Sequence, residues 1–474
     1  MLGGISLEDE KIDKNVFLSN IITAFLAQGV SLILSLFMSF IIPKFLGIIE
    51  YSYWQLFIFY IGYVGLFHFG FNDGIYLRWG GKNYNELNYE QLGTQFKILA
   101  LIECFIALII GIVTCIREDG IERKYVWIFV SIYLIFNNLH LFYGYVFQAV
   151  NKTKIYSKSI ILDRICVLTF VILLLIRKET HFIPFVSSYT ISKIISFIYL
   201  SYKGKDIFFA HCGNIKEALK DMYISLECGI KLVFANIMSM LVLGIGRIMI
   251  DNVWGIEAFG KISFSLSLTN FFLVFIQQIS MVLFPTLRRI TEKQQKNIYN
   301  IIRTILGFVF PLAFICYFPI KYFVNLWLPQ YDISIRYLVL LLPLCTFDGK
   351  MQMLCNTYLK VFRQEKMLLK LNIISFFTSL FFCFISAYIF KNMTLVVISM
   401  VCSVALRSIM AEIYLAKMMD AKILKMLIQE IFLVVIFIGS AWFLNEKIAF
   451  IIVIIEYIVF ILSNKRSYVH LKIQ

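Results

Sequence analysis

The stretch GLFHFGFNDGIYLRWGGK, residues 65–82, ends a run apolar enough to enter a lipid bilayer, yet it carries a His, an Asn-Asp pair and an Arg. Similar apolar runs recur along the whole chain and extend for about 18 to 25 residues, the length that a helix needs to cross ~30 Å of hydrocarbon. Polar side chains at that depth face a protein interior or a water-filled cavity, because lipid offers them no partners.

The composition is that of an integral membrane protein. Of 474 residues, 60% are hydrophobic and 15% are charged, whereas a soluble domain carries about 25% charged residues. Continuous apolar runs exclude an outer-membrane barrel, whose strands alternate in polarity. The 10 Cys residues show no CxxC or Cys/His spacing, so we expect neither a metal nor a disulfide framework. The N-terminus, MLGGISLEDEKIDK, lacks a signal-peptide pattern, so the first helix should stay as a span.

These runs predict an all-α polytopic membrane protein with about fourteen transmembrane helices. The helices are expected near residues 17–42, 52–77, 93–116, 125–149, 156–176, 181–202, 223–250, 257–284, 298–320, 336–360, 367–390, 394–416, 425–444 and 447–463.

The chain is expected to form two six-helix lobes followed by two further helices. The longest polar gap comes after six helices, so we predict an N-terminal lobe over 1–202, a cytoplasmic linker over 203–222, a C-terminal lobe over 223–420, and two additional helices with a cytoplasmic tail over 421–474. An even number of helices per lobe gives both lobes the same orientation, which is a parallel repeat with its axis along the membrane normal.

A short internal repeat supports this division. PKFLGIIEYSYW, residues 43–54, aligns with DNVWGIEAFGKI, residues 251–262, and shares a Gly-Ile pair after apolar residues. We call these two stretches the repeat segments. Each follows the first expected helix of its lobe, as a duplicated six-helix unit requires.

Lysine and arginine set the orientation, because cytoplasmic loops keep an excess of positive charge. The alternation places both termini in the cytoplasm and supports an even number of helices. An anionic inner leaflet beside these loops explains most of the +15 net charge, so nucleic acid is not needed as a partner. The inner loops are predicted to hold, among others, Lys152, Lys203, Lys293, Lys366 and Lys422.

Several motifs resemble a known family. LGIIEYSYWQLFIFYIGYVGLF (46–67) with DGIYLRWGGK (73–82), GIGRIMIDNVWGIEAFGKISFSLSLTN (244–270) and VLFPTLRRI (282–290) are similar to bacterial polysaccharide-unit flippases. These form the O-antigen flippase-like branch of the multidrug/oligosaccharidyl-lipid/polysaccharide exporter superfamily. The resemblance implies alternating access by two lobes and transport of an undecaprenyl-pyrophosphate-linked oligosaccharide from the cytoplasmic to the outer leaflet, for O-antigen in lipopolysaccharide or for capsule assembly.

The resemblance also implies partners. The lipid-linked oligosaccharide and membrane lipids are the expected binding partners, and a polysaccharide polymerase and glycosyltransferases are the expected neighbours in the same process. We expect no cofactor, although export can be coupled to a proton or sodium gradient.

Charged side chains near the centres of the expected helices are the candidate functional residues, because each costs at least ~2.5 kcal/mol at that depth. Cations outnumber acids there, and such a cavity suits a pyrophosphate, whose oxygens accept hydrogen bonds from Lys and Arg. The predicted substrate-binding cations, including one at the cytoplasmic mouth, are Arg78, Arg164, Lys193, Lys231, Arg247 and Lys350. A further mid-span cation is Arg407, and the mid-span acids are Glu103, Asp163, Asp348 and Glu456.

Local spacing favours an ion pair for some of these cations. Arg247 has Asp251 one turn ahead and Lys231 has Glu227 one turn back, spacings that put both charges on one helix face. Lys193 has no carboxylate one turn away, so it needs a partner from another helix or a ligand.

Buried acids are the candidates for ion coupling, because a carboxylate inside a transporter can bind and release a proton or Na⁺. Asp73, Glu103 and Asp348 are the best-placed acids. The alternative for each is an ion pair with one of the buried cations.

The quoted stretch combines packing with charge. Gly70 and Gly74 form a small-xxx-small pair that lets a neighbouring helix approach. Asp73 is close enough along the helix to pair with Arg78 or Lys82. For His68 we favour a hydrogen bond between helices, and the alternative is a group that titrates.

Other functions have less support in the sequence. A flippase for the peptidoglycan lipid precursor or another exporter of the same superfamily would share this layout. A polysaccharide polymerase or ligase would need a large outer loop, and the longest expected here is about 15 residues around Lys321 to Ile335, without HExxH, GxSxG or GxxxxGK[ST] signatures. We therefore expect no enzyme, while a scaffolding role would leave the deep charges dispensable.

Overall fold

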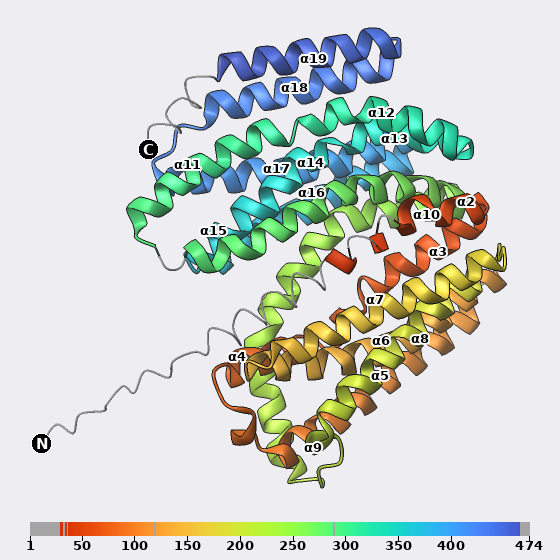
Figure 1. Ribbon diagram of the computed structural model, residues 1–474, viewed down its shortest axis with the longest axis vertical. Coiled ribbons are helices and arrows are strands. Elements are labelled where there is room, and N and C mark those ends of the chain that lie inside the picture. The colour runs from red at the N-terminus through yellow and green to blue at the C-terminus, as the bar shows by residue number, and fades with distance from the viewer. Residues whose placement is uncertain (1–28, 32–33, 36, 118–119, 288–289, 465–474) are drawn as a thin grey trace, which may run out of the picture. The chain divides into compact units, whose positions relative to one another are not determined.

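A computed structural model describes residues 29–31, 34–35, 37–117, 120–287 and 290–464 (Figure 1). Those residues form α-helices with short 3₁₀ and π segments and no strand, which confirms the all-α prediction. The first expected helix, 17–42, and the N- and C-terminal tails lie largely outside the described residues.

The described part of the chain has nine helices long and apolar enough to cross a membrane, or up to eleven if each of two bent pairs is one span. A multi-pass helical membrane protein is thus confirmed, whereas the predicted number of about fourteen is not. Part of the difference arises at α10 (Ile215–Leu287), which covers the expected helices 223–250 and 257–284 and is kinked between them at Gly255. The last helix, α19 (Glu446–Ser463), is apolar but carries Glu446, Lys447 and Glu456.

Two compact units divide the chain. Unit 1 comprises Met1–Leu34, Ile61–Arg177 and Ile183–Ile230. Its long helices are α5 (Tyr89–Arg117), α6 (Ile121–Ala149), α7 (Thr153–Ile176) and α8 (Phe182–Lys203), together with the start of α10; its shorter elements are η1 (Val64–Leu66), α4 (Phe71–Trp79), η2 (Tyr84–Glu86) and α9 (Lys205–Phe208).

Helix α6 lies at the centre of unit 1, where it packs against α4, α5 and α7. An aromatic core forms on its buried face around Phe142, Tyr143 and Phe147, against Phe96 of α5. Because α6 contacts α4 and α5 at once, a polar side chain on α6 can reach both helices.

Unit 2 comprises Ser35–Tyr60, Lys178–Phe182 and Lys231–Gln474. Besides the rest of α10 it contains α2 (Ile42–Phe45), α3 (Ile48–Ile61), α11 (Glu292–Val309), α12 (Leu312–Trp327), η3 (Pro329–Tyr331), α13 (Asp332–Leu341), α14 (Pro343–Lys350), η4 (Met351–Cys355), α15 (Asn356–Val361), α16 (Glu365–Phe384), η5 (Ile385–Ile389), α17 (Met393–Met419), α18 (Leu424–Phe443) and α19. Helix α17 packs against α13, α14 and α16, and α18 pairs with α19. The lobe boundaries drawn from the sequence stay a prediction.

The second expected span, 52–77, is not one helix. It is interrupted between Leu66 and Phe71, where Phe69 and Gly70 have positive φ angles of 50° and 90°. A Cβ on Gly70 would lie 2.5 Å from the backbone of Gly229, and a Cβ on Gly74 would lie 1.9 Å from the Ser225 carbonyl oxygen. The pair of glycines therefore does permit a close helix approach, as predicted, but Gly70 also forms the break itself.

A second interruption divides the expected helix 336–360. The helices on either side of Leu342 are bent by 46°, and α14 begins at Pro343, which has no N–H to donate to the preceding turn. The prediction of an outer loop at Lys321 to Ile335 was wrong, because these residues are largely helical. Helix α12 continues to Trp327, and η3 leads directly into α13. The described chain therefore offers no long loop there.

The two repeat segments occupy equivalent places and contact each other within unit 2. Gly47 immediately precedes α3, and Gly255, with φ 82° and ψ −179°, interrupts α10 at the aligned position. The helices that follow pack closely, since a Cβ on Gly260 would lie 1.8 Å from Ser52 Oγ. Phe59 and Phe259 meet edge to face across the same contact.

Candidate functional site

Four charged side chains form a closed cluster in the interior of unit 2. Arg303 of α11 lies 2.6 Å from Glu412 of α17 and 3.4 Å from Glu430 of α18. Lys350 of α14 lies 2.8 Å from Glu412 and 2.6 Å from Glu430. We call these residues the tetrad. Their side chains are at most 3% exposed, so two cations and two carboxylates neutralise each other away from water and tie four helices together.

The tetrad includes a residue expected to bind substrate. The ammonium group of Lys350 already donates to two carboxylates, so it can reach a ligand only if the tetrad opens. Sequence inspection passed over Arg303, Glu412 and Glu430. The signal for the two acids was present, because each is a carboxylate inside an apolar run.

Asp348, a candidate for ion coupling, also has a cation as partner. Its Oδ1 accepts a hydrogen bond of 2.6 Å from Arg407 Nη2, and Gln352 donates to Oδ2. A second nitrogen of Arg407 donates to Ser239 Oγ at 2.6 Å. This arrangement matches the ion pair that the sequence left open as the alternative.

In unit 1, Lys193 finds its partner on another helix. Its Nζ lies 2.9 Å from Asp163 Oδ2 on α7, and both side chains are less than 10% exposed. The next residue on α7, Arg164, has a buried Nε without a hydrogen-bond partner among the described residues. The sequence had offered a partner helix or a ligand for Lys193, and the observed contact is the partner helix.

A polar group beside this pair was not anticipated. His140 of α6 lies within 3.0 Å of the hydroxyl groups of Ser159 on α7 and Ser196 on α8. Because isolated Ser residues are common in transmembrane helices, the sequence carried no signal that these three would converge.

Arg78 lies at the end of α4 and binds α10. Its Nη1 donates to the Asp221 carbonyl and to Ser225 Oγ, both at 2.8 Å, and Nη2 lies 3.3 Å from the Asp221 carboxylate. The predicted pairing of Asp73 with Arg78 or Lys82 was wrong. Asp73 instead accepts from Tyr145 at 3.4 Å and lies 3.8 Å from His68, because the break at Gly70 turns α4 toward α6 and α10.

His68 also differs from expectation. Its Nδ1 accepts a hydrogen bond of 3.1 Å from the Gly70 N–H, so the contact lies within the break and does not join two helices. His68 satisfies an amide at the start of α4 that has no partner in a preceding turn.

Two predicted cations of α10 have different surroundings. Arg247 donates to Ser263 Oγ at 2.7 Å, and its guanidinium lies over the rings of Phe59 and Phe259. Lys231 is exposed, and in the described chain no ion pair joins it to Glu227, so that predicted pair was wrong.

Glu103 has no cation as partner among the described residues. Its side chain on α5 is 0% exposed, and Oε2 accepts a hydrogen bond of 2.9 Å from Asn138 Nδ2 on α6. The alternative reading, in which this acid pairs with one of the mid-span cations, is therefore wrong.

The excess of deep cations inferred from the sequence disappears in part. Lys193, Lys350 and Arg407 each have a carboxylate within 3 Å. The partners of Lys193 and Arg407 are mid-span acids that the sequence count included, whereas Glu412 and Glu430 beside Lys350 are two that it omitted. Arg164 and Arg247 are half-buried, and both stay candidates to meet an anionic ligand.

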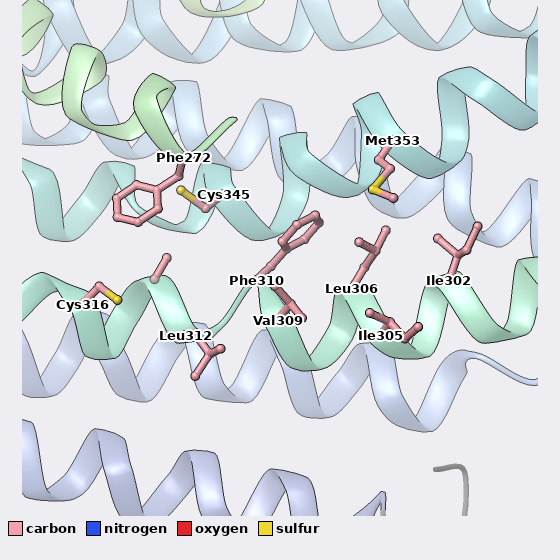
Figure 2. A pocket seen from close by; sticks show the side chains of 11 residues that line it. Phe272, Ile302, Ile305, Leu306, Val309, Phe310, Leu312, Cys316, Cys345 and Met353 are labelled. Atoms are coloured by element: carbon pink, nitrogen blue, oxygen red, sulfur yellow. The ribbon is translucent and has the colours of Figure 1, made fainter. Parts of the chain in front are cut away.

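An apolar pocket of about 520 Å³ opens in unit 2 (Figure 2). Phe272 of α10, Cys345 of α14 and Met353 of η4 face a row of side chains from α11 and α12. All its lining residues are of apolar types; the others are Ile302, Ile305, Leu306, Val309, Phe310, Leu312, Ala313 and Cys316. The pocket can accept hydrocarbon but offers no group to bind a phosphate.

A chain with only helices, broken spans and buried ion pairs in its described part is typical of polytopic transporters. No protein-family model matches this sequence, and no curated protein matches it. Solved structures do match in fold, and they are transporters and flippases of the MOP superfamily.

A structure of the lipid II flippase MurJ in an inward closed conformation matches with a TM-score of 0.65 and 14% identity over 94% of this chain and 99% of that one. An inward-facing multidrug resistance MATE family transporter of the MOP superfamily matches with a TM-score of 0.58 and 12% identity, over 85% and 98%. A point mutant of the Vibrio cholerae MATE transporter VcmN gives 0.54 and 13%, over 86% and 97%. The chain therefore has the fold of these transporters.

Proposed function

We propose that this protein is a flippase for a lipid-pyrophosphate-linked oligosaccharide, moving it from the cytoplasmic to the outer leaflet of a bacterial inner membrane by alternating access. The observation that carries the proposal is the likeness in fold, over nearly the full length of both chains, to a flippase of a lipid-linked substrate. The motifs at 46–82 and 244–290 favour O-antigen or capsule repeat units as the substrate.

Different groups are proposed for the two ends of the substrate, and each is described within its own unit. The apolar pocket is suited to the prenyl chain, because all its lining residues are apolar. Arg78, Arg164 and Arg247 are proposed to meet the pyrophosphate, since guanidinium groups bind phosphate oxygens in pairs. Lys193, Lys231 and Lys350 stay in the proposal beside them; carboxylates hold Lys193 and Lys350, as Asp221 holds Arg78, and Lys231 is exposed.

Complementation tests the substrate. In cells that lack their own polysaccharide flippase, expression of the full chain is expected to restore surface polysaccharide, and the Arg164→Gln, Arg247→Gln double variant is expected to abolish this. The matched control is Lys124→Gln, which removes a positive charge from the N-terminal turn of α6. Normal surface polysaccharide in the double variant would remove both arginines from the mechanism.

A second candidate is a flippase for the peptidoglycan lipid precursor, favoured by the similarity to the lipid II flippase fold. Cells depleted of their lipid II flippase distinguish the two. If expression of this protein keeps those cells alive but does not rescue the polysaccharide-deficient strain, the second function is supported and the first is refuted. A polymerase and glycosyltransferases are proposed neighbours in the first case, and both termini are proposed to be cytoplasmic.

The pocket gives an independent check on the lipid part. Ala313→Trp fills part of a volume of about 520 Å³, and we expect flipping of a long-chain substrate in proteoliposomes to fall several-fold. A short-chain analogue serves as the matched substrate, because it needs less of the pocket. An equal loss for both substrates would show that the variant perturbs the fold instead.

A further inference from the structure

Glu103 is a buried carboxyl group whose surroundings are neutral. Asn138 Nδ2 supplies the one hydrogen bond to Oε2, and Oε1 is buried with no hydrogen-bond partner among the described residues. The first expected helix, which is largely undescribed, carries no Lys, Arg or His between Asn15 and Pro43, so it has no cation to offer. An anion in such a place keeps its full desolvation cost, whereas a proton removes the charge.

The titratable groups on the elements packed against Glu103 have other partners. On α6, His140 binds Ser159 and Ser196, and at the break His68 binds the Gly70 N–H. Asp73 of α4 accepts from Tyr145. The remaining charges near α5 lie toward its two ends: Lys97 donates to the Ala210 carbonyl and Asp206 of α9 accepts from Tyr84 near the N-terminal end, and Arg117 is the last residue of the helix. No charged group of the described chain therefore compensates Glu103.

Asn138 connects Glu103 to the interrupted second span. The same Nδ2 group donates to the Val64 carbonyl of η1 at 3.0 Å, and the Asn138 carbonyl accepts from Asn72 Nδ2 of α4 at 3.1 Å. Both Asn side chains are 0% exposed. One residue thus contacts the carboxyl group and both sides of the break at 67–70.

We propose that Glu103 is the proton-binding site of this transporter and that Asn138 links its protonation to the break at residues 67–70. The proton resides on Oε1, because Oε2 is occupied by the Asn138 N–H. When Glu103 loses its proton, the carboxylate competes with the Val64 carbonyl for the two N–H groups of Asn138. The bond to η1 weakens, and the segment that carries α4 and Arg78 is freed to move.

The proton site does not depend on the identity of the substrate, whereas its use in transport rests on the proposed function. The bound ion is assigned as a proton, because one carboxyl oxygen and one amide donor do not form the oxygen-rich shell that a metal cation requires. If Na⁺ at constant pH stimulated transport by the wild type, and this stimulation were lost in Glu103→Gln, the assignment to a proton would be overturned.

Infrared difference spectroscopy on the purified full chain tests the site directly. Between acidic and alkaline buffer, the wild type is expected to lose one carboxylic-acid C=O band that shifts in ²H₂O, and Glu103→Gln is expected to lack this band. Glu90→Gln removes an exposed acid on the same helix and serves as the control. Identical spectra for the wild type and Glu103→Gln would refute the proton site, whatever the chain transports.

Hydrogen exchange tests the link to the break. After correction for the intrinsic effect of pH, protection of the amides of residues 64–74 is expected to fall at alkaline pH in the wild type and to stay constant in Glu103→Gln. An equal change in both proteins would refute the link through Asn138. In proteoliposomes, Glu103→Gln should keep downhill flipping but lose its stimulation by a pH gradient; absence of any flipping in the wild type would count against the proposed function alone.

Discussion

Glu412 in unit 2 and Glu103 in unit 1 are both buried acids on transmembrane helices, but their partners differ. Glu412 is held by Arg303 and Lys350 at 2.6 and 2.8 Å, whereas Glu103 has one amide donor. A carboxylate among cations is stable as an anion and fixes helices in place, while a carboxyl group among neutral groups changes charge only by exchanging a proton. A buried glutamate can therefore hold helices together in one region and be suited to bind and release a proton in another.

Removing one acid of the tetrad should have the largest effect. Glu412→Gln leaves Arg303 and Lys350 with one carboxylate between them, so we expect the free energy of unfolding in mixed micelles to fall by about 5 kcal/mol. Replacing all four tetrad residues by Met and Leu of similar volume should recover much of this loss, because no charge then stays buried. An unchanged unfolding midpoint in Glu412→Gln would show that Glu412 does not stabilise the fold through its cations, and the contrast with Glu103 would then fail.

The Lys193 and Asp163 pair in unit 1 should give an intermediate loss. Asp163→Asn leaves the buried Lys193 ammonium without its carboxylate, near the ring of Tyr133, at an expected cost of about 3 kcal/mol. The double variant Asp163→Leu, Lys193→Met is the control, and it should be more stable than Asp163→Asn. A double-mutant cycle with no coupling energy would contradict the ion pair.

Glu103→Gln should hardly change stability. If Glu103 already holds a proton, an amide of the same shape preserves the neutral contact with Asn138, and the change in the free energy of unfolding stays below about 1 kcal/mol. Asn138→Leu is the contrasting variant, since it deprives the Val64 carbonyl of its donor as well. A loss in Glu103→Gln as large as in Glu412→Gln would show that Glu103 is an anion with an undescribed cation.

The smallest effect is expected at Glu86, an exposed acid outside the membrane spans. The side-chain and backbone N–H groups of Asn83 hold the pKa of Glu86 below its ordinary value. Its contribution is therefore present above the unfolded-state pKa and is lost as the pH falls through the lower folded-state pKa. Hydrogen exchange at residues 84–87 should increase over that acidic range in the wild type, and Glu86→Ala should abolish this dependence.

Residue pattern alone predicted the helical class and many helix positions, because an apolar run of sufficient length has few other stable forms in a bilayer. It also identified the small-residue pair Gly70 and Gly74. It did not predict the break at Gly70, since a positive φ angle there depends on the approach of Gly229 from α10.

Partners of buried charges were predicted only where sequence spacing was decisive, and even there with errors. Lys231 does not pair with Glu227 in the described chain, and Arg78 binds Asp221 across 143 positions of sequence. Ion pairs between helices depend on how far each helix slides and turns against its neighbour, which no local pattern records.

The sequence by itself determined that this chain is a multi-pass helical membrane protein, where most of its apolar spans run and some of the charges that lie within them. Those properties follow from the transfer of each side chain into hydrocarbon, which is local and nearly additive. The tertiary structure decided which charges neutralise each other, which acid stays without a cation in the described chain and where an apolar pocket opens. These properties depend on distances of a few ångströms between helices far apart in sequence, because electrostatic and hydrogen-bond energies in a medium without water change steeply over that range.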